Sequence, residues 1–145
     1  MTTGRKFSAR AATCCTKAGL LILLGLLLST PAHAATDSDM SQEYSACMDK
    51  AKGVTSEMID CMSAETARQD ARLNANYKRL MAKLSAKRKN TLLEAQRAWI
   101  KFRDVNCKFY YDPDGGTAAR LAANDCFLQA TAARAKELKS LTNDE

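Results

Sequence analysis

The chain has 145 residues, with 22 lysines and arginines against 16 aspartates and glutamates, a net charge of +6. Four of the basic residues and no acidic one precede residue 35, so the remainder holds 18 basic against 16 acidic residues, net +2. A nearly balanced charge gives no electrostatic basis for nucleic-acid binding. The only histidine is His33, so residues 35–145 cannot form a His-containing catalytic triad.

The first 34 residues have the three parts of a secretory signal peptide. A basic segment is followed by the apolar run AGLLILLGLLL and then by PAHA, which ends in the small–x–small pattern of a cleavage site. Pro31 stops the apolar run short of the ~20 residues that a membrane span needs. Cys14 and Cys15 precede that run, so a lipoprotein anchor is not expected.

This pattern predicts a cleaved signal at 1–34, a polar lead-in at 35–40 and one domain at 41–145. After cleavage the protein would have no stable membrane anchor. We therefore expect an exported protein.

The first two predicted helices flank the connector KGVT. Residues 41–51 have apolar side chains at helical spacing, and Thr55 is a suitable N-cap for the second helix. That helix is amphipathic for about eight turns, until the polar stretch SAKRKN weakens the pattern.

Two more helices are predicted toward the C-terminus. Thr91 and Glu94 fit a capping box that opens a third helix, which runs through Trp99 to about residue 109. The stretch YDPDGGT predicts a turn, with Thr117 as the N-cap of a fourth helix that ends near residue 141. No segment alternates as a strand does. The expected fold is all-α, a small bundle of about four helices in antiparallel hairpins.

Four cysteines follow the predicted cleavage site: Cys47, Cys61, Cys107 and Cys126. An even number in a small exported domain predicts two disulfides. A zinc site is less favoured, because the chain has neither a CxxC pair nor a usable histidine, and we expect no metal and no cofactor. Cys47–Cys61 and Cys107–Cys126 are each centred on a predicted turn, whereas Cys61–Cys107 is centred on residue 84, before the predicted connector. We therefore expect the first two pairs.

Four polar side chains lie on otherwise apolar helix faces, beside the expected core anchors Leu73, Tyr77 and Trp99. These polar residues are Asn74, Gln96, Arg103 and Arg134. One interpretation is a buried hydrogen-bond network that sets helix register, with guanidinium stacking on Trp99 or Tyr77. The other is a polar pocket that binds a ligand. We favour the network, because buried polar groups usually satisfy one another.

The turn and the remaining acidic residues offer little catalytic chemistry. The turn segment Asp112, Asp114, Gly115 and Gly116 lacks the further ligands of an EF-hand, so we treat it as a candidate binding loop rather than a calcium site. The other carboxylates, for example Glu65, Asp70 and Asp104, are expected on solvated helix faces beside basic residues. No acid–base pair is therefore predicted, and we do not expect an enzyme.

Several segments in order resemble the LprI family, named for a mycobacterial lysozyme-inhibitor lipoprotein. They are LNANY, AQRAWIKFRD followed by a cysteine, the glycine pair, and the late Cys126 and Arg134, within a stretch from Cys47 to Leu138. The resemblance implies a small disulfide-linked helical domain of the bacterial envelope, periplasmic or secreted, and we expect this domain to bind another protein. The partner could be a lysozyme; the alternative is an envelope structural or stress-related interaction protein without a lysozyme target. This chain differs from the family's namesake in having no lipidation cysteine.

Overall fold

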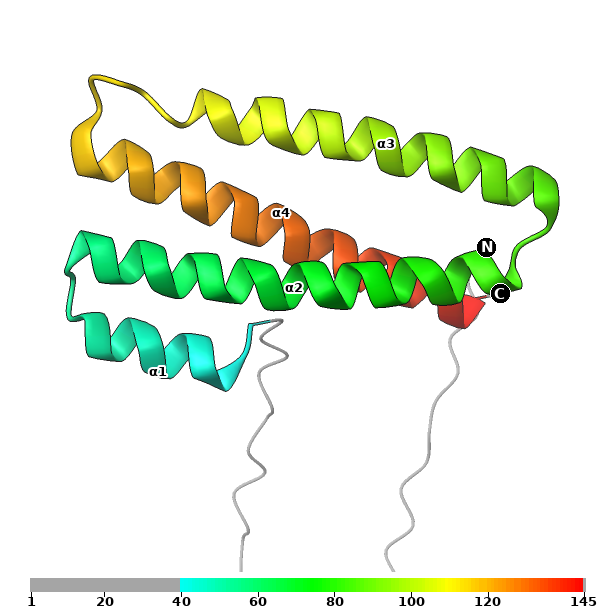
Figure 1. Ribbon diagram of the computed structural model, residues 1–145, viewed down its shortest axis with the longest axis horizontal. Coiled ribbons are helices and arrows are strands. Elements are labelled where there is room, and N and C mark those ends of the chain that lie inside the picture. The colour runs from blue at the N-terminus through cyan, green and yellow to red at the C-terminus, as the bar shows by residue number, and fades with distance from the viewer. Residues whose placement is uncertain (1–39, 145) are drawn as a thin grey trace, which may run out of the picture. The chain divides into compact units, whose positions relative to one another are not determined.

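The computed structural model describes residues 40–144, so the predicted signal peptide and most of the lead-in lie outside the described part. The described residues form four α-helices and no strand (Figure 1). The helices are α1 (Gln42–Ala51), α2 (Thr55–Lys83), α3 (Ala86–Phe109) and α4 (Gly116–Asp144). Consecutive helices run antiparallel, which confirms the predicted all-α fold of helical hairpins.

The turn between α1 and α2 is short because Lys52 and Gly53 both adopt positive φ angles, 46° and 83°. Ser41 caps α1, its hydroxyl oxygen accepting a hydrogen bond from the Tyr44 backbone N–H at 3.1 Å. The N-cap of α2 is Val54, one residue before the predicted cap Thr55, which is already helical.

The start of α3 was predicted incorrectly. The connector between α2 and α3 consists only of Leu84 and Ser85, so SAKRKN lies mainly inside α3 rather than between helices. Thr91 is therefore not a cap, and its hydroxyl donates to the Lys87 carbonyl one turn earlier. A run of lysines and arginines has good helix propensity, which outweighs the loss of apolar periodicity there.

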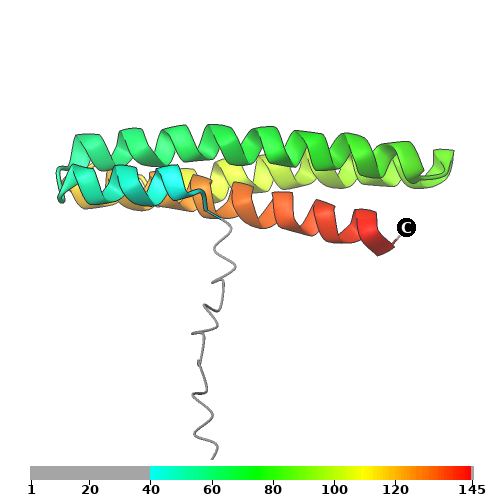
Figure 2. The same ribbon diagram turned by 90° about the horizontal axis from the view of Figure 1, so that it is seen from below.

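Helix α4 begins at Gly116, one residue before the predicted cap Thr117, and continues to Asp144. Its buried positions are rich in small side chains: Ala119, Ala123, Thr131, Ala132 and Ala135. Small residues let another helix approach closely, and α2 packs along α4 as the main interface of the domain (Figure 2). No helix within residues 40–144 has the length and apolarity to span a bilayer.

The core lies between α2 and α4, around Leu73, Leu80, Leu84, Ala135 and Leu138. Two of the expected anchors, Tyr77 and Trp99, pack against this cluster while keeping part of their surface exposed, and Leu73 is fully inside it. Helix α3 contributes little to the core, since only Gln96 and Cys107 on it are buried.

Both predicted disulfides are confirmed. Cys47–Cys61 joins α1 to α2 with a Cα–Cα distance of 5.7 Å, and Cys107–Cys126 joins α3 to α4 at 5.4 Å. The ground for rejecting Cys61–Cys107 was wrong, however. Its midpoint, Leu84, does lie at the real connector. The pairing follows instead from packing, because α1 packs on α2 and α3 packs on α4.

Candidate functional site

Gln96 and Arg134 form a buried pair between α3 and α4. The Arg134 Nε–H donates to Gln96 Oε1 at 3.0 Å, and its Nη1 lies 2.7 Å from the Glu137 carboxylate one turn later. The guanidinium carbon also lies 5.9 Å from the centre of the Trp99 ring. Arg134 is thus neutralised and hydrogen-bonded, as a buried charge must be. The contact fixes the register of α3 against α4.

Arg103 lies one to two turns farther along α3 and is only partly buried. Its guanidinium is held between two aromatic rings, 5.1 Å from the Trp99 centroid and 5.5 Å from that of Phe127. It pairs with Asp104 at 2.8 Å and reaches Thr131 Oγ1 at 3.5 Å. The contact with Phe127 joins α3 to α4, whereas the contact with Trp99, which the sequence suggested, lies within α3.

Asn74 does not belong to this network. Its side chain is exposed and its amide donates to Asp70 within α2, at 2.8 Å. The buried asparagine is Asn76, whose Nδ2 donates to the Ala135 carbonyl of α4 at 2.8 Å. Positions 74 and 76 differ by about 200° around the helix axis. The sequence can therefore identify the buried asparagine only if the face that α2 turns toward α4 is already known.

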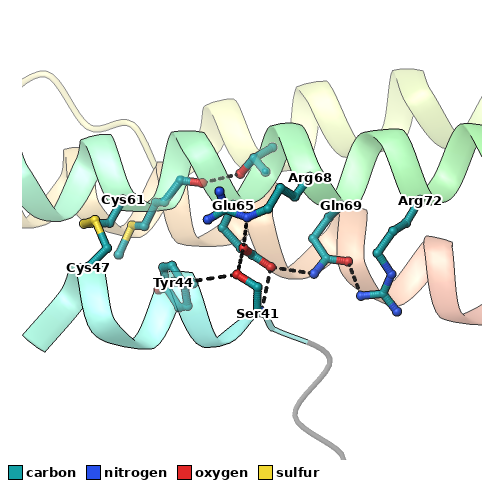
Figure 3. Close-up of polar contacts among 10 residues, drawn as sticks. Ser41, Tyr44, Cys47, Cys61, Glu65, Arg68, Gln69 and Arg72 are labelled. Atoms are coloured by element: carbon teal, nitrogen blue, oxygen red, sulfur yellow. Dashed lines mark hydrogen bonds and ion pairs between the residues drawn. A yellow bond between two sulfur atoms is a disulfide. The ribbon is translucent and has the colours of Figure 1, made fainter.

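A second polar cluster, centred on Glu65, joins α1 to α2 (Figure 3). The Glu65 side chain is completely buried, which contradicts its predicted place on a solvated face. Its carboxylate accepts hydrogen bonds from the Ser41 backbone N–H at 3.0 Å and the Ser41 hydroxyl at 2.6 Å. Arg68 Nε and Gln69 Nε2 each donate at 2.7 Å.

These contacts set the charge state of Glu65. Burial alone raises the pKa of this carboxyl, but the hydrogen bonds from Ser41, Arg68 and Gln69 outweigh burial and lower the pKa from 4.5 to about 2. Glu65 is therefore ionised at neutral pH and holds the N-terminal end of α1 on α2. The sequence contained one indication of this position: Glu65 is spaced by four residues from both Cys61 and Gln69, on the face that α2 buries.

The candidate binding loop forms a tight, exposed turn between α3 and α4. Asp112 Oδ1 accepts from the Asp114 backbone N–H at 2.9 Å, and the Gly115 N–H donates to the Asp112 carbonyl at 3.1 Å. A Cβ on Gly115 would lie 2.7 Å from Ala119 Cβ, so only glycine fits. Gly116 has a φ of 61°, which also favours glycine.

Apolar side chains on the C-terminal half of α3 face solvent. Phe102, Val105 and Phe109 are 65%, 72% and 84% exposed, and their spacing of three and four residues places them on one side of the helix. We call them the apolar face of α3. Phe102 lies in the segment AQRAWIKFRD and Val105 directly follows it, but helix periodicity alone did not show that their side chains face outward. Contiguous exposed apolar surface is a common feature of interaction sites on proteins.

Within residues 40–144 no group of three or more His, Cys, Asp or Glu side chains is placed to hold a metal ion. The fold and its surface thus define a class: a small, disulfide-linked helical domain that presents an apolar face beside an exposed, hydrogen-bonded turn. The family model described as Lysozyme inhibitor LprI matches residues 47–138, and the chain belongs to this family.

One relative is a protein of Rhizobium meliloti (strain 1021) described as uncharacterized protein R02472. It is 30% identical over 95 residues, which cover 56% of this chain and 68% of the relative. No solved structure matches the chain.

Proposed function

We propose that this protein works outside the cytoplasm by binding another protein, and that the partner is a lysozyme whose activity it inhibits. The observation that carries the proposal is the apolar face of α3 in a chain of the LprI family. A monomeric domain has little reason to leave three large apolar side chains so exposed on one helix unless something covers them.

Export is supported by the two disulfides and by the signal-peptide pattern before residue 35. Structural disulfides form and persist in oxidising compartments such as the periplasm. The protein would act there by occluding its partner rather than by catalysis.

The test is a turbidity assay with lysozyme and peptidoglycan, using protein purified from the periplasm. The folded protein should slow the clearing of the suspension in proportion to its concentration and saturate near one inhibitor per lysozyme. The control is the same protein reduced, alkylated and freed of reductant, because lysozymes often contain disulfides themselves. Unchanged clearing at a large molar excess of folded protein would reject lysozyme and leave an envelope interaction protein with another target.

A further inference from the structure

The apolar face of α3 leads directly into the turn between α3 and α4. We call residues 109–114 the tip; it contains Phe109, Tyr110, Tyr111, Asp112 and Asp114. Tyr110 and Tyr111 are also exposed, so aromatic surface continues from the helix onto the turn. Aromatic residues are the side chains that most often anchor protein interfaces.

The charge of the tip has one sign. Residues 109–114 include no lysine or arginine, whereas Asp112 and Asp114 are both exposed. Lys108 and Arg120, also exposed, flank the turn, so the negative charge is confined to the tip itself. A partner that meets the tip therefore gains from carrying positive charge at the rim of its binding site.

A disulfide and contacts within the turn constrain the tip. The Cys107–Cys126 disulfide joins the two helices just behind it. Within the turn, Asp112 accepts from the Asp114 N–H, and the rings of Phe109 and Tyr110 make an edge-to-face contact with centroids 5.9 Å apart. A preorganised loop loses less conformational entropy when it docks than a flexible loop does.

We propose that the tip and the apolar face of α3 together form the docking surface for a cationic protein, with the tip entering a concave site on it. This inference rests on the proposed function, because it names the element that would occupy the lysozyme cleft. A second copy of this chain paired tip to tip fits less well, since Asp112 and Asp114 of both copies would come together.

Two variants separate the contributions of aromatic contact and charge. Phe109→Ala with Tyr111→Ala removes the aromatic contact. Asp112→Asn with Asp114→Asn removes two charges, while the amide oxygen introduced at position 112 can still accept from the backbone N–H that closes the turn. The matched controls are Leu93→Ala and Glu94→Gln, both at exposed positions of α3 in the half distant from the tip.

Binding is measured by calorimetry against a basic c-type lysozyme and against cytochrome c, a basic protein without a glycan cleft. The aromatic variant should weaken lysozyme binding about 10- to 100-fold, as loss of interface anchors does. The charge variant should weaken it about threefold to tenfold at low salt and much less at 0.5 M salt, where exposed charges are screened. The Leu93 and Glu94 controls should bind as the unmodified protein does.

The outcomes distinguish the two proposals. If the protein inhibits lysozyme and the tip variants, folded by circular dichroism, inhibit equally well, the docking surface is wrong and the function stands. If binding depends on the tip but lysozyme stays active, inhibition is wrong and the surface stands. Equal affinity for cytochrome c would reject entry into a concave site. If sedimentation shows a dimer of the unmodified protein and the aromatic variant is monomeric, a second copy of this chain covers the surface, and the proposal of a cationic partner is wrong.

Discussion

Replacing Glu65 with glutamine should destabilise the protein at neutral pH and remove part of its sensitivity to acid. The carboxylate accepts four hydrogen bonds, two of them from Ser41 at the start of α1. A glutamine keeps one acceptor oxygen but loses the charge, and its amide group would face N–H and O–H donors. The N-terminal end of α1 should then separate from α2 more easily, although the Cys47–Cys61 disulfide still tethers the helix.

The magnitude follows from the pKa of Glu65. A carboxyl whose pKa falls from 4.5 to about 2 on folding contributes about 3 kcal/mol at neutral pH. The Arg68 side chain is 42% exposed, so water screens part of this interaction, and we reduce the expected contribution to about 2 kcal/mol. For a domain of this size, that loss corresponds to a decrease in Tm of roughly 10 °C.

The sign of the pH dependence is defined by the lowered pKa. The unfolded chain binds the proton first, so the stabilisation is complete above pH 4.5 and is lost as the pH falls toward about 2. Thermal unfolding followed by circular dichroism between pH 2 and 7 should show the unmodified protein and Glu65→Gln differing at pH 7 and converging at pH 2. Glu94→Gln, on the exposed side of α3, serves as the control. A Tm difference that is the same at pH 7 and pH 2 would show that the charge of Glu65 is not the source.

Three further changes test the packing of α3 on α4. Arg134→Ala leaves the buried Gln96 amide oxygen without its donor and should lower the free energy of unfolding in urea by about 2–3 kcal/mol. Arg103→Ala mainly loses contacts with aromatic rings and should cost less, about 1–2 kcal/mol. Equal losses would contradict this order. Gly115→Ala should lower stability by about 1–3 kcal/mol, because the new Cβ meets the next turn of α4 at 2.7 Å; an unchanged urea midpoint would mean that the turn relaxes freely. Serine at both Cys107 and Cys126 should cost about 3 kcal/mol for a closed loop with a separation of 19 residues, and a loss below about 1 kcal/mol would indicate that packing alone holds this hairpin.

Local sequence patterns were sufficient for the number of helices, and they gave both disulfide pairs correctly although the ground for rejecting Cys61–Cys107 did not hold. Periodic apolar residues predicted four helices, and the centring of each cysteine pair on a turn, at Val54 and between Gly116 and Thr117, predicted both pairs. These features depend on residues close to one another in the chain. The start of α3 was missed because a lysine-rich segment can be helical without any apolar periodicity.

The polar contacts were predicted less well. The sequence placed Gln96, Arg103 and Arg134 near the apolar faces, and the structure brings Gln96 and Arg134 into direct contact. Asn74 was chosen where Asn76 is buried, and Glu65 was assigned to solvent. Both errors concern the direction that a side chain on α2 faces, which depends on α1 and α4 rather than on α2 itself.

The sequence by itself determined an all-α domain of helical hairpins, because helix periodicity and turn residues act over a few positions. Only the tertiary structure decided which helices form the core. Helix α2 packs closely on the small side chains of α4, which leaves α3 with two buried residues and an apolar face in solvent. That outcome depends on how well the surfaces of different helices fit together, a property of the assembled bundle that no single segment contains.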